Sequence, residues 1–431
     1  MNLSGVASIV IFSIAYFFIA TEKVNKTIVA ILGATTMIFF GLFQESEKVW
    51  ATYIDFNTIF LLLGMMTFVS VLEESGLFQY IGIRIVQHSG RSSKKLFIML
   101  TLFVAVMSGF LDNVTTILVA MPLTFAVTEP LGMDPLPFVI GEIFASNIGG
   151  TMTLIGDPPN IMIGSEAHLD FIQFLINTGP VAILMLFLSD LMLILFFRKE
   201  FSKEIDKKVI ESLDPKTSIS SVRDFRLSIV FFVATVTLFL LQSVTHIENS
   251  AIAMTAGFTS MLFMEGKKVD YILKKVDWST LTFFLGLFVM VGALGDTGVL
   301  NELAKIMISF SHNSYKLMEA LIISFSAVLS SIIDNVPLTA TLIPVIKSLH
   351  SLDPKVYADL TPLWWSLSLG ACLGGNGTVV GASANVVALA LLKRSYKKEI
   401  SFFKFLKYGI VVLGSSIILS IFYVLVRYGH G

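Results

Sequence analysis

Two short polar motifs interrupt long apolar stretches of this 431-residue chain, and each places a carboxylate beside an amide. Asp112 and Asn113 form the first motif, and Asp334 and Asn335 form the second. A carboxylate at membrane depth is costly unless it is paired, binds an ion or takes up a proton. The four side chains are therefore candidates for an ion or proton site. The simpler alternative is that each aspartate only caps the helix that follows it.

A second pair of motifs is rich in glycine and amides. GGTMTLIGDPPN runs from Gly149 to Asn160, and GGNGTVVGASAN runs from Gly374 to Asn385. The double proline of the first motif forbids a regular helix there. Unwound backbone can offer carbonyl groups to a cation, while the adjacent helix N-termini can face an anion or a polar solute. Tight glycine packing between helices is the alternative, but it leaves the ordered Asn and Asp residues unexplained.

Together these motifs define the predicted substrate and ion site, and we predict no catalytic residue. The candidates are Asp112, Asn113, Asn147, Gly150, Thr151, Thr153, Asp157 and Asn160 in the first half, and Asp334, Asn335, Gly375, Asn376, Thr378, Ser383 and Asn385 in the second. The candidate Na⁺ ligands are Asp112, Asn113, Asp334 and Asn335. Asp157 and the prolines after it are replaced by Ala382, Ser383 and Ala384 in the second motif. We therefore expect the two half-sites to differ in charge.

Other residues narrow the class of protein. Glu142 lies within an apolar stretch and has either a functional or a paired structural role. Trp364 and Trp365 are typical of an aromatic belt at a membrane surface. The single cysteine, Cys372, rules out an intrachain disulfide and a multi-thiolate metal site. The chain contains no GxxxxGK[ST] motif, which argues against a nucleotide-driven motor of its own.

The elements that must position these residues are membrane helices. Hydrophobic residues make up 55% of the chain and charged residues 14%, whereas soluble proteins carry about a quarter charged. Apolar runs of roughly 17–25 residues are typical of spanning helices, and the runs here do not alternate as barrel strands would. The predicted full spans are about 4–20, 26–43, 56–72, 136–165, 175–197, 227–243, 249–264, 278–295, 362–392 and 405–426, with hairpin-like stretches at about 96–128 and 317–349.

The chain also repeats itself. The segment Asp55–Phe78 aligns with Asp277–Leu300, 222 residues later, and the same offset relates the two Asp-Asn motifs. An offset of 225 relates the two glycine-rich motifs. Each half has an odd number of full spans, so we expect an inverted repeat, the architecture of secondary transporters. The predicted parts are a first repeat at 1–198, a charged cytoplasmic linker at 199–226 and a second repeat at 227–431.

Charge distribution predicts the orientation. Most of the 30 Lys and Arg residues fall in alternate loops, and such loops face the cytoplasm. We therefore expect a multi-pass protein of the inner (plasma) membrane, with both termini outside the cytoplasm.

At the quoted motifs the sequence resembles a known group. GFLDNVTTILVAMPLT followed by FASNIGGTMTLIGDPPNIMIG is similar to the arsenite permease and P-protein branch of the ion transporter superfamily. This is the citrate-transporter-like domain family, related to divalent-anion/sodium symporters. The resemblance implies two inverted repeats, each with a re-entrant hairpin and a broken helix. It also implies a scaffold domain, often dimeric, an elevator-type movement, and a site between hairpin tips and broken-helix loops.

The motifs also depart from the related dicarboxylate carriers, which resemble Ser-Asn-Thr at both tips and GTPPN at the loop. Here the tips read Asp-Asn-Val and the loop reads GDPPN. Three carboxylates near one pocket would repel a dianion. We therefore expect a secondary active transporter coupled to H⁺ or Na⁺, for arsenite and antimonite efflux or for sodium/proton antiport.

Two alternatives stay open. One is a sodium-coupled symporter for a small anion such as a di- or tricarboxylate or sulfate. The other is a channel, or the membrane subunit of an arsenite pump driven by a separate ATPase subunit. In each case we expect a small solute, the lipid bilayer and a second copy of the chain as partners. We expect no enzyme activity, no nucleic acid and no cofactor beyond the coupling ion.

Overall fold

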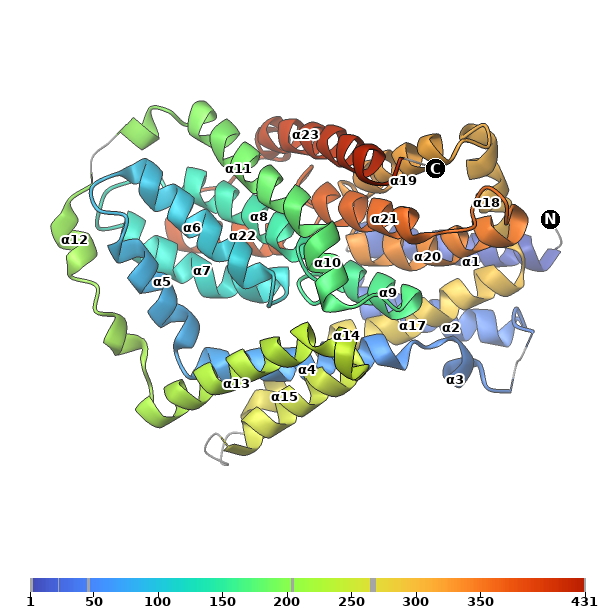
Figure 1. Cartoon of the computed structure of the whole chain (residues 1–431), viewed down its shortest axis with the longest axis horizontal. Helices are drawn as coiled ribbons and strands as arrows, with labels where there is room; N and C mark the ends of the chain where they lie inside the picture. Colours follow the sequence, from blue (N-terminus) through green and yellow to red (C-terminus); the bar gives the residue numbers. More distant parts are fainter. Residues whose placement is uncertain (1–2, 22, 45–46, 203–204, 264–268, 430–431) are drawn as a thin grey trace.

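The structure is a computed structural model that describes residues 3–21, 23–44, 47–202, 205–263 and 269–429. The described residues form only helices and their connections (Figure 1). The first half contains α1 (Leu3–Thr21), α2 (Lys26–Phe39), α3 (Val49–Tyr53), α4 (Phe56–Glu74), α5 (Leu77–Gln87), α6 (Ser93–Ser108), α7 (Asn113–Thr128), α8 (Leu136–Thr151), α9 (Pro158–Ala167), α10 (Phe171–Asn177) and α11 (Gly179–Phe196). The connection holds η1 (Glu200–Ser202), α12 (Lys207–Glu211) and η2 (Pro215–Ser218).

The second half is also a series of helices, with short helices at partly different places between the longer ones. It contains α13 (Val222–Leu240), α14 (Gln242–Thr245), α15 (Asn249–Phe263), α16 (Val269–Lys275), α17 (Trp278–Asp296), α18 (Val299–Phe310), α19 (Tyr315–Ser330), α20 (Asn335–Leu352), α21 (Thr361–Gly374), α22 (Ser383–Tyr396) and α23 (Phe402–Tyr428). The all-helical prediction is confirmed.

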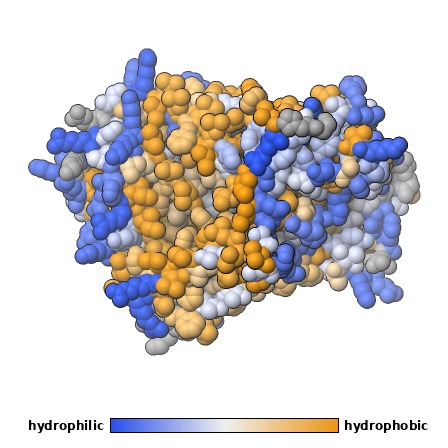
Figure 2. All heavy atoms as spheres, viewed as in Figure 1, coloured by the Kyte–Doolittle hydropathy of each residue, from blue (hydrophilic) through white to orange (hydrophobic). Residues whose placement is uncertain are grey.

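The surface is that of a membrane protein. Figure 2 shows a broad hydrophobic band across the molecule, with hydrophilic residues gathered at both ends of the view. Five described helices are long and apolar enough to cross a bilayer alone: α1, α4, α11, α17 and α23. Most of the remaining predicted spans consist of shorter helices. Two of them, the stretches 136–165 and 362–392, each break into two helices.

The helices form two layers (Figure 1). In what we call the support layer, α4 packs against α15, and α2 packs against α17. In the hairpin layer, α6 packs on α8 and α8 on α11, while α19 packs on α21 and α21 on α23. The halves also interlock within the hairpin layer, because α7 contacts α22 and α20 contacts α9. The residues of the candidate site lie where these contacts meet.

Local geometry recurs at the offsets that the sequence predicts. Asp55 caps α4 and Asp277 caps α17, each through its side chain. Gly76 before α5 and Gly298 before α18 both have positive φ angles, 79° and 77°, a conformation that glycine adopts without strain. These two pairs of equivalent positions thus share local geometry, while the structural repeat and its inverted orientation in the membrane stay predictions.

Close packing explains one glycine of each broken helix. A Cβ atom on Gly149 would lie 2.2 Å from the carbonyl oxygen of Ala105 on α6, and one on Gly374 would lie 2.6 Å from that of Ala327 on α19. Because no real Cβ fits at such distances, glycine lets the hairpin press directly against the helix that breaks. Gly149 and Gly374 therefore pack tightly against a neighbouring helix, as the alternative of tight glycine packing predicts. They also lie in the last turns of α8 and α21.

One sequence prediction is wrong. Trp364 and Trp365 lie inside the protein, with exposed fractions of 6% and 1%, and do not form an aromatic belt. The ring of Trp365 packs edge-on against Phe174 of α10, with centroids 5.0 Å apart. Tryptophan fits both a membrane surface and a protein core, so its type alone could not distinguish the two positions.

Candidate functional site

Four asparagines join the first hairpin and the two broken helices in one hydrogen-bonded cluster. The Asn113 side chain, at the start of α7, donates to Asn147 Oδ1 on α8 at 3.3 Å. Asn147 in turn donates to Asn376 Oδ1 at 2.9 Å and to Asn385 Oδ1 at 3.0 Å. All four side chains are buried. The structure therefore brings predicted residues from both halves to one place, although they are up to 272 positions apart in the chain.

Each break is clamped by an asparagine on the helix that follows it. Asn160 donates to the carbonyl groups of Gly150, Thr151 and Thr153 at 3.2, 3.4 and 2.9 Å. Asn385 donates to those of Gly375 and Thr378 at 2.8 and 2.9 Å. These bonds satisfy carbonyl groups that the broken helix cannot pair.

The threonines of both breaks tie them to the neighbouring hairpin. The Thr153 hydroxyl donates to the carbonyl of Gly109, and the Thr378 hydroxyl donates to that of Ser331 at 2.5 Å. Thr151 donates to the Asn147 carbonyl within its own helix at 2.8 Å. These threonine hydroxyls thus hold the loops in place, and each oxygen can still accept a hydrogen bond or ligate a cation while it donates.

Two serines that we did not include in the candidate site make a matching contact in each half. Ser108 Oγ donates to the Ser146 carbonyl at 2.7 Å and to Asn113 Oδ1 at 2.6 Å. Ser330 Oγ donates to the Ala371 carbonyl at 2.6 Å. Both serines lie in the repeated hairpin motif, so the internal alignment carries the signal that identifies them.

Cys372 occupies the position that Asn147 holds in the first half, 225 residues earlier. Its thiol donates to Asn160 Oδ1 at 3.4 Å, as Asn147 donates to Asn385. Ser368 adds a second donor to Asn160 Oδ1 at 2.7 Å. In the second half, the Cys372 thiol therefore makes the contact that the Asn147 amide makes in the first half.

Asp157 is the fully buried carboxylate of the cluster, with an exposed fraction of 2%. It precedes α9, yet its side chain does not cap that helix. Its Oδ2 instead accepts a hydrogen bond from Asn335 Nδ2 at 3.0 Å, and its carboxylate interacts with Cys372 and Asn113. Asp157 thus lies between the tip of one hairpin and the tip of the other.

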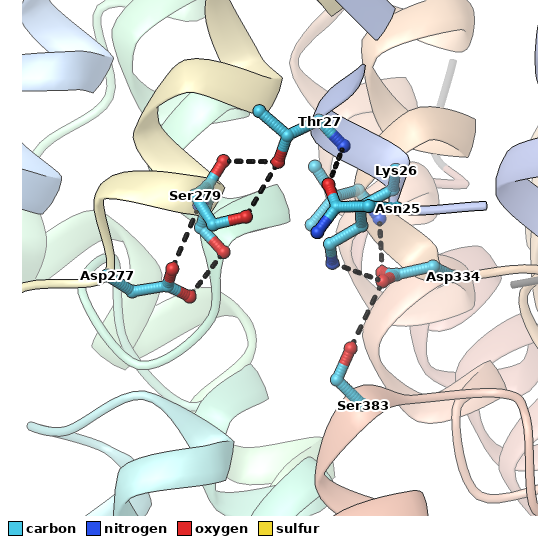
Figure 3. A network of polar contacts seen from close by, with 9 residues as sticks. Asn25, Lys26, Thr27, Asp277, Ser279, Asp334 and Ser383 are labelled. Carbon is cyan, nitrogen blue, oxygen red and sulfur yellow. Dashed lines mark hydrogen bonds and ion pairs between the residues drawn. The ribbon is translucent and has the colours of Figure 1, made fainter. Parts of the chain in front are cut away.

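The two tip aspartates have different partners. Asp112 caps α7 through the Thr115 N–H at 3.0 Å and accepts the Thr115 hydroxyl at 2.5 Å. Asp334 accepts the Val336 N–H at 3.2 Å, and its Oδ2 faces the Lys26 ammonium and the Ser383 hydroxyl, each at 3.3 Å. Figure 3 shows Lys26 reaching from α2 toward Asp334 while Ser383 approaches from α22. Asp334 therefore links the support layer to the hairpin layer.

The four predicted Na⁺ ligands contact different partners. Asn113 belongs to the asparagine cluster and Asn335 to Asp157, while Asp112 and Asp334 have the partners given above. Within the described residues there is also no group of three or more His, Cys, Asp or Glu side chains that could hold a metal ion. Asp157 contacts Asn113 of the asparagine cluster, whereas Asp112 and Asp334 bond to other groups. The geometry therefore favours Asp157, and not the two tip aspartates, as the carboxylate that gives the cluster its negative charge.

Sequence reasoning missed Lys26. It belongs to neither pair of polar motifs, and its partner Asp334 lies 308 residues away. No local pattern signals such a pair, since only the packing of α2 against α17 brings the start of α2 to the second hairpin. The neighbouring Thr27 hydroxyl bonds to Ser279 of α17 at 2.7 Å and fixes this start (Figure 3).

Comparisons with known proteins agree with this architecture. A 46 kDa membrane protein of Mycobacterium leprae is 38% identical over 98% of this chain and 99% of its own length. An uncharacterized transporter of Mycobacterium tuberculosis is 39% identical over the same shares. The P protein of Sus scrofa is 30% identical over 97% of this chain and 59% of its own length, so the expected resemblance to P protein is confirmed.

Two solved transporters share the fold. The YdaH transporter of Alcanivorax borkumensis superposes with a TM-score of 0.59 at 14% identity, over 93% of this chain and 89% of that one. MtrF of Neisseria gonorrhoeae superposes with a TM-score of 0.58 at 11% identity, over 88% and 82%. The citrate transporter family matches residues 16–370 of this chain. The chain therefore belongs to the citrate transporter family and is a membrane transporter, not an enzyme.

Proposed function

We propose that this protein is a secondary active transporter, coupled to H⁺ or Na⁺, that moves a neutral or cationic small solute by alternating access. Asp157 carries the proposal, because it is a buried carboxylate between the two hairpin tips and has no Lys or Arg partner among the described residues. A negative charge in such surroundings attracts a proton or a cation. The same charge, with Asp334 nearby, opposes a dianion or trianion.

The cluster also offers a donor. The Asn376 side-chain amide is buried, and its nitrogen has no hydrogen-bond partner among the described residues. Buried donors are seldom left unpaired, so this one suits an acceptor oxygen on a solute. Arsenite and antimonite are neutral hydroxides at pH 7, and they carry both O–H donors and acceptor oxygens. Arsenite or antimonite efflux is therefore our first choice of activity, and sodium/proton antiport is the second.

The contact between the layers supports a movement of the hairpin layer past the support layer. Lys26 and Asp334 join the layers through a partly exposed ion pair, and exposed pairs contribute only about 0–1 kcal/mol. Such a contact can break and re-form during each transport cycle. An elevator-type movement in a homodimer of the plasma membrane, with both termini outside the cytoplasm, is part of the proposal.

The test is flux in proteoliposomes that contain the purified chain and a trapped pH-sensitive dye. Imposed H⁺ and Na⁺ gradients should drive arsenite across the membrane, or, for sodium/proton antiport, Na⁺ influx should alkalinise the lumen and Na⁺ efflux should acidify it. Sodium-driven citrate, succinate or sulfate uptake without arsenite or Na⁺/H⁺ flux would favour the anion symporter instead. A strict need for an added ATPase, or flux at channel rates, would favour the remaining alternative.

A further inference from the structure

A second carboxylate of the hairpin layer lies outside the asparagine cluster. Glu142 of α8 is fully buried, with an exposed fraction of 0%. Its Oε1 accepts a hydrogen bond from the Thr124 hydroxyl of α7, and its Oε2 has no partner among the described residues. A buried acid with one hydrogen bond and no counter-ion is costly to keep unless it serves a function.

The second half shows that the fold itself does not need this acid. The residues at the repeat offsets from Thr124 and Glu142 are Ile346 and Leu367. Both are fully buried apolar side chains in the core. An aliphatic pair thus fills the equivalent place, and replacing a buried polar pair by apolar residues of similar volume is often neutral or stabilising. The needs of the fold therefore do not explain the Glu142–Thr124 pair, whereas a function of the carboxylate would.

Three hydroxyl groups, those of Thr124, Thr128 and Tyr396, lie between Glu142 and the end of α22, and we call them the hydroxyl series. Thr128 lies one helical turn beyond Thr124 on the same face of α7, and its hydroxyl donates to the Thr124 carbonyl at 2.8 Å. The phenol oxygen of Tyr396, the last residue of α22, lies 3.1 Å from the Thr128 hydroxyl. Tyr396 is half-buried and is followed by the exposed Lys397. Hydroxyls one turn apart lie about 6 Å from each other, a gap that one water molecule can bridge.

The inner end of this series reaches the candidate site. Glu142 and Asn147 are five residues apart on α8, which is about 7.5 Å along the helix axis. Between them, the carbonyl of Ser146 accepts the hydroxyl of Ser108 at the end of α6. A change at Glu142 is thus one to two turns from the amide that joins both halves of the cluster.

Few charged groups face Glu142. The helix α8 packs against α6, α7, α11, α21 and α22. The titratable or charged side chains on those helices are Lys94, Lys95, Asp190, Cys372, Lys393, Arg394 and Tyr396. None of them forms an ion pair or hydrogen bond with Glu142 among the described residues. Lys94 and Lys95 lie at the start of α6, while Lys393 and Arg394 lie in the last turn of α22, which ends at Tyr396.

We propose that Glu142 is a proton-carrying residue, loaded and unloaded through the Thr124, Thr128 and Tyr396 hydroxyls. The Thr124 hydroxyl passes its H⁺ to Glu142 Oε1, which becomes a neutral acid, and takes an H⁺ in turn from the Thr128 and Tyr396 side. The return step runs the same transfers backwards, so each hydroxyl gives up one H⁺ for each H⁺ it accepts and ends unchanged. This inference rests on the proposed function and specifies its coupling ion as the proton.

The experiment compares three variants in the proteoliposome assay, with arsenite and Na⁺ as probes. E142Q keeps the size of the side chain and removes its proton. The double variant E142L/T124I copies the aliphatic pair of the second half. D190N is the matched control, because Asp190 is also buried and also accepts a threonine hydroxyl, that of Thr101 at 2.8 Å, but lies outside the hydroxyl series.

We expect E142Q and E142L/T124I to lose the pH dependence of flux and to slow proton-coupled flux at least about tenfold. D190N should stay within about twofold of the unchanged protein, as expected for an independent position. Proton-coupled flux that keeps its pH dependence in E142Q would overturn the role of Glu142 while leaving the proposed function intact. An equal loss in D190N would assign the effect to helix packing and would also overturn it.

Infrared difference spectra of the purified protein between two pH values give a readout that does not need transport. A carboxyl band that is present in the unchanged protein and in D190N, and absent in E142Q, would show proton binding by Glu142 even if no probe were transported. If no probe moved with protons and this band were present, the proposed substrates would be wrong and the proton site would stand. Absence of the band would overturn the proton site.

Discussion

The two hairpin tips carry the same Asp-Asn-Val sequence and use it differently. Both oxygens of Asp112 accept hydrogen bonds from Thr115, in the first turn of the helix that Asp112 caps. Asp334 also caps its helix but holds Lys26 and Ser383 as well. The residue at the repeat offset from Lys26 is Glu248, which is exposed and has the opposite charge. The comparison teaches that the repeat supplies the framework, while partners outside the repeated motifs give each tip its own role.

The two breaks differ in the same way. Asp157 and Ala382 occupy equivalent positions before α9 and α22, with nearly equal backbone angles (φ −145° and −149°, ψ 135° and 145°). Because either residue fits this backbone, the carboxylate is not there to shape the loop. It contacts Asn335 of the opposite half instead.

The largest effect is expected where the breaks differ most. Asp157→Ala gives the first break the residue that the second already has, so the chain should fold. It removes a hydrogen bond to a charged group, typically about 1.5–3 kcal/mol, which corresponds to a loss of about 10–100-fold in coupled flux. Proteoliposome flux measures the effect, and thermal unfolding confirms folding. Asp157→Asn, which keeps an acceptor without the charge, should lose coupling as well; wild-type flux in that variant would refute a charge-based role.

An intermediate effect is expected from separating the layers at the second tip only. Lys26→Met removes the ammonium group but keeps the length of the side chain. A partly exposed ion pair contributes about 0.5–1 kcal/mol, so the flux should change about two- to fivefold.

A double-mutant cycle sharpens the comparison of the tips. The effect of Lys26→Met should vanish in an Asp334→Asn background and stay complete in an Asp112→Asn background, because Asp334 is the tip aspartate that forms an ion pair with Lys26. Simple additivity with Asp334→Asn would show that the ion pair has no part in the movement. Coupling to Asp112→Asn instead would show that the two tips are equivalent after all.

The smallest effect is expected from making the halves more alike. Cys372→Asn places the Asn147 equivalent in the second half and exchanges a weak thiol donor to Asn160 for an amide. A neutral hydrogen bond contributes about 1 kcal/mol, so the melting temperature should shift by about 2 °C at most. Flux should stay within about twofold. A severe loss, with the melting temperature unchanged, would mean that the difference between Asn147 and Cys372 is itself functional.

Much of the fold was predictable because its signals are local or periodic. Long apolar runs require membrane helices, and the glycines and prolines around Asp157 require a break. The repeated motifs and their flanking residues include Asn113, Asn147, Asn376 and Asn385, and the structure joins these four side chains by hydrogen bonds. The partners of Asp334, the burial of Trp365 and the pairing of Glu142 with Thr124 were not predictable, because each depends on which helices meet.

The sequence by itself determined the membrane class, the repeat and the places where helices stop, since composition, spacing and backbone restrictions act within a few residues. Only the tertiary structure decided what each carboxylate does. Asp112 binds its own helix, Asp334 binds another layer, and Asp157 and Glu142 point into the interior. The physical reason is that the cost of a buried charge depends on its neighbours, and those neighbours come from parts of the chain that only packing brings together.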